Sequence, residues 1–222
     1  MQSYIEFLHR YAPSFITGTI VTLQQTGLAI VLAIMVALIA AFMKMSPLFF
    51  IRWPAVAYIE IFRGTSLLVQ VYWIFFVLPL FGITLEPFTA GFIAVGLNLG
   101  AYGAELVRGG VQSVPRGQYE AAIALSIPPF KQMRRIIFPQ ALLNMLPPWG
   151  NLFIELLKST ALVALISVTD LMFQSKQINS TTFLSAQAFG TALIIYYIIA
   201  RFIITPGMRW LENRLSRKLS IG

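Results

Sequence analysis

Five runs of apolar residues divide the 222-residue chain, and each is long enough to cross a lipid bilayer as a helix. They cover residues 11–43, 64–85 with an extension back over 53–59, 87–104, 141–169 and 177–200. A bilayer core about 30 Å thick requires about 20 helical residues. The runs are continuous rather than alternating, which argues against a membrane barrel. We therefore predict an all-α membrane protein of about five transmembrane helices, forming one domain over residues 1–222.

The composition agrees with a chain that lives in lipid. Apolar residues make up 58% of it, charged residues only 11%, and the mean hydropathy is +0.78. Soluble domains average about 45–50% apolar and about 25% charged. The chain has no cysteine and a single histidine, His9. A disulfide framework and a thiolate metal site are therefore excluded, serine–histidine catalysis is disfavoured, and we expect neither an enzyme nor a metal-binding protein.

The net charge of +8 comes from bases that lie between the apolar runs rather than on one soluble domain. A nucleic-acid partner is therefore not expected. Most bases follow the first and third runs or close the chain: Lys44, Arg52, Arg108, Arg116, Lys131, Arg134, Arg135, Arg209, Arg214, Arg217 and Lys218. Lys176 alone lies between the fourth and fifth runs. Because bases accumulate in cytoplasmic loops, this alternation predicts an outside N-terminus and a cytoplasmic C-terminus.

Residues 113–139, which include the stretch YEAAIALSIPPFKQMRRIIFP, interrupt the membrane pattern and are predicted to be cytoplasmic. We expect two short helices joined by a sharp turn. Ser113 is the predicted N-cap of the first helix. Pro128 and Pro129 are predicted to end that helix, since proline cannot continue it. Residues 130–138 form the predicted second helix.

The first of these helices carries a small, flat surface beside a charge. Ala121, Ala122 and Leu125 predict an apolar patch next to Glu120, suited to docking into a groove of another protein. Pro139 marks the predicted return to the membrane. The competing interpretation is an amphipathic helix at the membrane surface, whose bases bind anionic lipid.

Several motifs carry a family resemblance. Glu120-Ala121-Ala122, followed by Ser126, Ile136 and Pro139, resembles the EAA motif of the membrane subunits of ABC importers. FRGTSLLVQ (62–70), ELVRGGVQSVPRG (105–117) and PPWGNLFIELLK (147–158) resemble the polar-amino-acid branch of that family. The sequence departs from the family pattern at Ser66, Ser126 and Phe138. Ser126 replaces a glycine at a turn that needs a positive φ, where a side chain costs about 1 kcal/mol.

The resemblance implies a type I, MetI-like importer fold in the bacterial cytoplasmic (inner) membrane. It also implies partners: two ATP-binding subunits, a second membrane subunit that is identical or similar, and an extracytoplasmic substrate-binding protein. The residues that would couple to the ATP-binding subunits are Glu120, Ala121, Ala122, Ser126, Arg134 and Pro139. The chain has no GxxxxGK[ST] loop, so ATP and Mg²⁺ are expected on the partners and no cofactor on this chain.

Polar residues within the apolar runs are candidates for a substrate pathway, because an unpaired charge in lipid is costly. Asn151, Glu155 and Lys158 fall on one helical face and offer an amide, an acceptor and a donor that complement a zwitterion. Arg63 and Gln70 are the other candidates. The structural alternatives are a Glu155–Lys158 pair at i, i+3 and an Arg63 salt bridge, within its helix or to Glu105.

Other residues of the third run are expected to hold helices together. Asn98, Tyr102 and Glu105 lie on one helical face and predict hydrogen bonds between helices, and Gly96 and Gly103, with Gly91 and Gly100, predict close helix contact.

The substrate class stays open between a polar amino acid and a related small solute, such as an ectoine-type compatible solute or an opine. An ATP-independent secondary transporter or channel is a further alternative. The lack of an evident inverted repeat disfavours it. A membrane anchor without transport activity would leave the charges of 141–169 unexplained.

Overall fold

The computed structural model describes residues 4–219, and within that range the chain contains helices and no strand. The α-helices are α1 (Tyr4–Lys44), α2 (Phe49–Gly64), α3 (Leu67–Tyr72), α4 (Pro87–Gln112), α5 (Arg116–Ala124), α6 (Pro129–Gln132), α7 (Phe138–Ser159), α8 (Leu171–Thr182), α9 (Ser185–Ile199) and α10 (Thr205–Leu219). Four continuous helical stretches are long and apolar enough to span a membrane: Tyr4–Lys44, Pro87–Gln112, Pro129–Ile166 and Ser185–Arg217. The bent pair Phe49–Gly64 and Leu67–Phe81 supplies a fifth, which confirms the prediction of about five spans.

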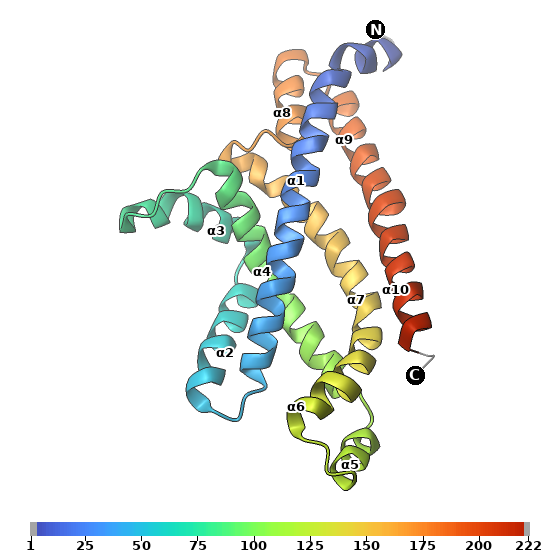
Figure 1. Ribbon diagram of the computed structural model, residues 1–222. Helices are drawn as coiled ribbons and strands as arrows, with labels where there is room; N and C mark the ends of the chain where they lie inside the picture. The colour runs from blue at the N-terminus through green and yellow to red at the C-terminus, as the bar shows by residue number, and fades with distance from the viewer. Residues whose placement is uncertain (1–3, 220–222) are drawn as a thin grey trace.

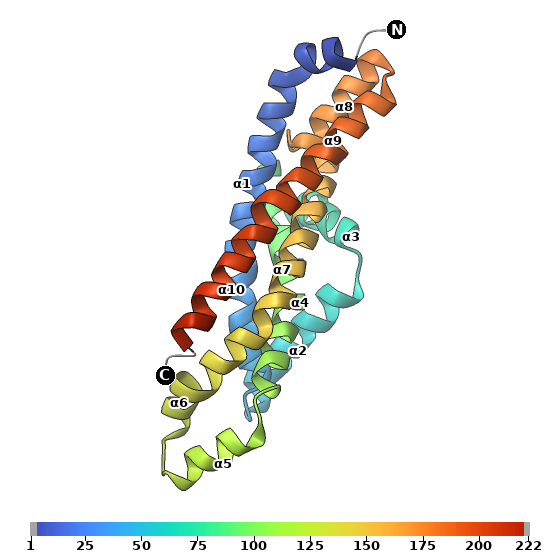
Figure 2. The ribbon, with the colours of Figure 1, turned by 90° about the vertical axis from the view of Figure 1, so that its right-hand side faces the viewer.

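The helices form an elongated bundle (Figures 1 and 2). The start of α1 and all of α8 lie at one end, whereas α5, α6 and the end of α10 lie at the opposite end. Termini at opposite ends fit an odd number of crossings. Which end is cytoplasmic stays a prediction.

The contact between α1 and α4 forms the centre of the bundle. Ala33 and Ala37, one turn apart on α1, are completely buried. On α4, a Cβ at Gly96 would lie 2.8 Å from Cδ2 of Leu32, and a Cβ at Gly103 would lie 2.9 Å from Cβ of Ala37. At Gly103 the Cβ would also lie 2.6 Å from Cη2 of Trp149 on α7. A larger residue at either position would therefore require its neighbours to shift, which confirms that these glycines permit close helix contact.

The second apolar run is not one straight span, so the prediction of a single span over 64–85, extended back over 53–59, is wrong as a continuous helix. The chain breaks between α2 and α3, where Thr65 and Ser66 are extended and the helices meet at 109°. A break at membrane depth requires new partners for the freed backbone groups. The side chains of Gln70 and Asn98 provide them, as described below.

The fifth run also divides, and its predicted start at 177 is wrong. α8 ends at Thr182, Phe183 takes a left-handed conformation with φ 56°, and α9 begins at Ser185. The reason is a separate helix start upstream: the Asp170 carboxylate accepts a hydrogen bond from the Phe173 N–H at 2.8 Å and caps α8. The membrane span therefore begins at Ser185.

Three π-helical turns precede prolines and reduce the steric clash that each proline ring causes with the preceding helical turn. The stretches Trp73–Val77, Met133–Ile137 and Ala200–Ile204 each end two residues before a proline, namely Pro79, Pro139 and Pro206. A proline ring crowds the carbonyl four residues earlier, and a wider turn moves that carbonyl away. The predicted short helix over 130–138 is thus wrong as a separate element, because Pro129–Ile166 runs as one helix.

Candidate functional site

The 113–139 segment projects from one end of the bundle as α5, a turn and α6 (Figure 2). The turn follows directly from the end of α5. Ser126 has φ 54°, its N–H donates to Ile123 O at 2.8 Å, and the Ile127 N–H donates to Ala122 O at 3.0 Å. These two bonds form a Schellman motif, whose left-handed position usually belongs to glycine. The predicted positive φ at Ser126 is confirmed.

Two details of the predicted loop are corrected. Ser113 is not an N-cap: it ends α4 with φ −76°, its hydroxyl donates to Gly110 O at 2.8 Å and accepts a hydrogen bond from Asn144 Nδ2 at 2.9 Å. Pro128 and Pro129 begin α6 instead of ending α5. The Schellman turn has already stopped α5, so the prolines are not needed for that purpose.

The tip of the segment exposes three large apolar side chains. Ile123, Leu125 and Phe130 are 68%, 74% and 74% exposed, and we call this set the tip patch. Ala121 is exposed beside it, but Ala122 is buried. The predicted patch is therefore corrected: Ala122 lies one helical step from Ala121 and faces inward. The sequence could not distinguish the two alanines without knowing which way α5 is turned.

The charges around the tip patch are open to a partner. Glu120 on α5 and Lys131, Arg134 and Arg135 after the turn are all exposed, and none forms an ion pair within residues 4–219. The Tyr119 hydroxyl donates to Val111 O of α4 at 3.1 Å and ties the segment to the bundle, and Gln132 Nε2 of α6 donates to Tyr119 O at 3.4 Å and joins α6 to α5. α5 is thus an exposed helix with a fixed attachment.

The predicted pathway residues of α7 do share one exposed face. Asn151, Glu155 and Lys158 are all exposed along it. Glu155 Oε2 and Lys158 Nζ are 2.7 Å apart, so the alternative i, i+3 pair is present. Both side chains are more than half exposed, which leaves this pair accessible to a ligand.

Gln70 lies at the break between α2 and α3, with its amide fully engaged. Its Nε2 donates to Phe62 O at 2.9 Å and to Thr65 Oγ1 at 2.7 Å. Asn98 Nδ2 on α4 donates to Gln70 Oε1 at 2.9 Å and to Phe62 O at 3.0 Å. Phe62 O belongs to the last turn of α2, where carbonyls lose their helical partners. The two buried amides therefore brace the break and confirm the predicted hydrogen bonding between helices at Asn98.

Arg63 sits on the exposed side of the same break. Its guanidinium carbon is 5.4 Å from the centre of the Tyr102 ring, and the Tyr102 hydroxyl donates to Arg63 O at 3.5 Å. The suggested link from Arg63 to Glu105 is wrong. Glu105 instead lies between Lys44 Nζ and Arg108 Nη2, each at 2.7 Å, and so joins α1 to α4. Within residues 4–219, no hydrogen bond or ion pair joins Arg63 or Gln70 to the polar face of α7.

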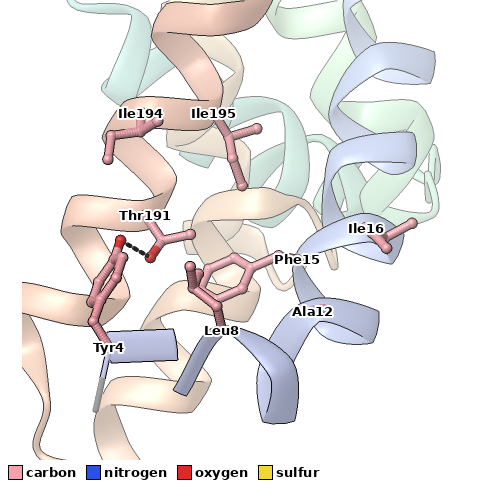
Figure 3. A pocket seen from close by; sticks show the side chains of 8 residues that line it. All are labelled: Tyr4, Leu8, Ala12, Phe15, Ile16, Thr191, Ile194 and Ile195. Atoms are coloured by element: carbon pink, nitrogen blue, oxygen red, sulfur yellow. Dashed lines mark hydrogen bonds between the residues drawn. The ribbon is translucent and has the colours of Figure 1, made fainter. Parts of the chain in front are cut away.

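Two apolar hollows are poor sites for a zwitterion. One, of about 480 Å³, lies beneath the α2–α3 break, and Gln70 and Thr65 are its only strongly polar lining residues. The other, of about 340 Å³, is a groove between α1 and α9 (Figure 3). Its one hydrogen-bonding pair is already formed, since Tyr4 and Thr191 bond to each other at 2.9 Å.

Sequence reasoning missed a buried carboxylate. Asp170 is completely buried, and the Tyr196 hydroxyl donates to its Oδ2 at 3.4 Å. Burial raises the pKa of Asp170 to about 6, although the bond from the Phe173 N–H opposes this. The available signal was the N-cap pattern, an aspartate directly before an apolar helix start. Within the described residues, no three metal-ligating side chains come together.

Comparison with known proteins places these features in one family. Residues 29–217 match the family described as the binding-protein-dependent transport system inner membrane component. The chain belongs to this family. It is 39% identical, over 94% of its own length and 90% of the relative's, to the probable amino-acid ABC transporter permease protein y4tF of Sinorhizobium fredii. It is 36% identical to the L-cystine transport system permease protein TcyB of Bacillus subtilis, covering 90% and 86% of the two chains. It is 34% identical to the glutamine transport system permease protein GlnP of Escherichia coli, covering 91% of this chain and 93% of the relative.

Solved structures agree. One chain of the crystal structure of an amino acid ABC transporter with histidines superposes with a TM-score of 0.88 at 38% identity, covering 96% of this permease and 99% of that chain. A chain of the MetNI methionine ABC transporter in an inward-facing conformation gives a TM-score of 0.75 at 16% identity, covering 93% and 98%. The second match shows the fold alone. Together they confirm the predicted MetI-like type I importer fold and the resemblance to amino-acid ABC permeases.

Proposed function

We propose that this permease is the membrane-spanning subunit of an ATP-driven importer that moves a polar amino acid, or a related small zwitterion, across the bacterial cytoplasmic membrane. The observation that carries the proposal is the projecting α5 helix, with Glu120 exposed beside the tip patch. Two ATP-binding subunits dock on this helix and its counterpart in a second, identical or similar permease. A substrate-binding protein delivers the solute at the opposite end. ATP and Mg²⁺ bind to the partner subunits.

The attachment of α5 suits it to transmit motion. Tyr119 ties α5 to the end of α4, and Asn144 ties Ser113 to α7. A pull on α5 therefore moves both spans instead of flexing the loop. Closure of the ATP-binding subunits draws the two permeases together at this end and opens them outward, and hydrolysis lets them relax inward.

The substrate passes the exposed polar face of α7. Glu155 and Lys158 exchange their mutual ion pair for the amino and carboxylate groups of the solute, and Asn151 adds an amide one turn away. Arg63, held against Tyr102, is a second carboxylate partner, while Gln70 keeps the broken span in shape. The names of the relatives, which include cystine and glutamine permeases, support a small polar amino acid.

The docking role is tested by charge reversal at Glu120. The Glu120→Lys variant, reconstituted in liposomes with its ATP-binding subunits and binding protein, should lose nearly all ATP-driven uptake. The matched control is Glu86→Lys, which reverses an exposed acid at the other end of α4 and should leave binding of the ATP-binding subunits unchanged. Normal uptake by Glu120→Lys would reject the docking role.

The substrate role is tested separately on α7. Lys158→Gln and Glu155→Gln should each lower ATP-driven uptake of the solute at least about tenfold. The free energy of unfolding should change by no more than about 0.5 kcal/mol, as is usual for exposed pairs. Calorimetry on the cognate binding protein identifies the solute to use. Unchanged uptake in both variants would reduce the pair to a structural one.

A further inference from the structure

The last membrane-spanning stretch exposes large apolar side chains before its basic end. Phe202 and Ile203 are 68% and 54% exposed, and they belong to the apolar stretch Ser185–Arg217. The stretch is long and apolar enough to lie among acyl chains, so its large exposed apolar side chains suit a lipid-facing surface. Figures 1 and 2 show α9 and α10 on the outside of the bundle.

A basic and aromatic cluster follows on α10. Trp210 lies seven residues after Ile203, which is about two turns and about 10 Å further along the same helix face. It is 60% exposed, and the guanidinium carbon of Arg214 lies 4.9 Å from the centre of its ring. Arg209 is exposed beside it. This cluster begins where the apolar face ends.

No acid neutralises these bases. Within residues 4–219, neither Arg209 nor Arg214 forms an ion pair with a carboxylate. The acid of this helix, Glu212, lies about 200° around the axis from Trp210. It is three residues after Arg209 and therefore a helical neighbour of that base, but the two form no ion pair within residues 4–219.

We propose that Arg209, Trp210 and Arg214 bind the headgroup of an anionic phospholipid. The guanidinium groups suit a phosphate, which they contact through two parallel hydrogen bonds. A tryptophan at the end of an apolar helix face prefers the headgroup level. The continuous apolar face from Phe202 onward holds the acyl chains of the same lipid, which favours a lipid over a soluble anion.

A lipid bound at this cluster would lie at the same end of the bundle as the 113–139 segment. Met208 of α10 packs on Gly150 of α7, whose Cβ position would lie 3.5 Å from Met208 Cβ. α7 continues the helix that starts at α6, next to the exposed bases of the 113–139 segment. The bound headgroup therefore fixes the depth of α10 at the same end of the bundle as α5.

The test measures lipid retained on the purified full transporter by native mass spectrometry, with phosphatidylglycerol and phosphatidylcholine offered in equal amounts. The Arg209→Gln/Arg214→Gln variant should lose phosphatidylglycerol by about fivefold for each base, the factor that corresponds to about 1 kcal/mol per basic residue near an anionic surface. Phosphatidylcholine should not change. The matched control is Lys176→Gln, which removes an exposed base on α8 at the other end.

Fluorescence quenching is a second readout, which tests the proposal even if the double variant folds poorly. Brominated phosphatidylglycerol should quench the fluorescence of the wild-type protein more than that of Trp210→Phe, a variant that keeps an apolar ring. Equal phosphatidylglycerol retention in the double variant, or equal quenching, would overturn the proposal. Loss of the ATP-binding subunits with unchanged lipid retention would also overturn it and assign the cluster to protein docking.

Discussion

Ser126 occupies a backbone position that usually belongs to glycine. Its φ of 54° completes the Schellman turn after α5. A side chain in this region costs about 1 kcal/mol, so Ser126→Gly should stabilise the 113–139 segment by about that amount. Hydrogen exchange at the Ile127 amide, whose bond to Ala122 closes the turn, measures the gain. Ser113→Gly, at a residue with φ −76°, should give no such gain in stability. Equal gains from the two substitutions would show that the backbone at Ser126 is not strained.

Asp170 should make stability depend on pH. Its folded pKa of about 6 exceeds the ordinary 3.8, because burial disfavours the charged form. The folded state therefore holds the proton more tightly than the unfolded state does. Stability should fall as pH rises from about 4 to about 6.

Thermal unfolding in detergent across that pH range measures this effect. Asp170→Asn keeps a good N-cap and removes the titration, so its curve should lack the decline attributed to Asp170. Identical pH profiles for the two proteins would show that this carboxyl does not titrate differently on folding.

At the scale of elements, the broken span depends on two amides. Gln70→Leu leaves Phe62 O and Asn98 with fewer partners, and each unsatisfied buried group costs about 1–3 kcal/mol. We expect a lower unfolding temperature and faster hydrogen exchange at the amides next to the α2–α3 break. Gln24→Leu, at an exposed glutamine of α1, should leave both unchanged.

A double-mutant cycle distinguishes the shared hydrogen bonds of Gln70 and Asn98 from the packing of their side chains. Asn98→Leu combined with Gln70→Leu should cost clearly less than the sum of the single changes, because both amides serve the same carbonyl. Additive losses would show that the two side chains act independently at the α2–α3 break.

At the scale of the whole molecule, we expect the ATP-binding subunits to bind at the tip patch. Leu125→Ser and Phe130→Ser should each weaken binding of the ATP-binding subunits by at least about tenfold, or 1.4 kcal/mol, since exposed apolar anchors dominate such contacts. Binding is measured on the purified permease by surface plasmon resonance. Phe183→Ser removes a similarly exposed ring in the turn between α8 and α9 and should have no effect. A loss of similar size there would point to general destabilisation.

The sequence by itself determined what local rules decide. Long uncharged runs require helices, since lipid offers no partners to a free backbone. Glycines such as Gly96 indicate close helix contact, and the EAA pattern predicts an exposed helix that ends in a left-handed turn at Ser126. Family and overall fold were accessible for the same reason: they depend on patterns that lie close together in the chain.

Only the tertiary structure decided how those helices use their polar groups. The break at Thr65, the inward direction of Ala122 and the pairing of Glu105 with Lys44 depend on residues that lie far apart in sequence. A hydropathy profile does not reveal them, because an apolar run can bend or end wherever a distant amide or carboxylate forms hydrogen bonds with its free backbone groups. The Asp170 cap follows the same principle: its N-cap pattern is local, but the burial that raises its pKa comes from packing against distant helices.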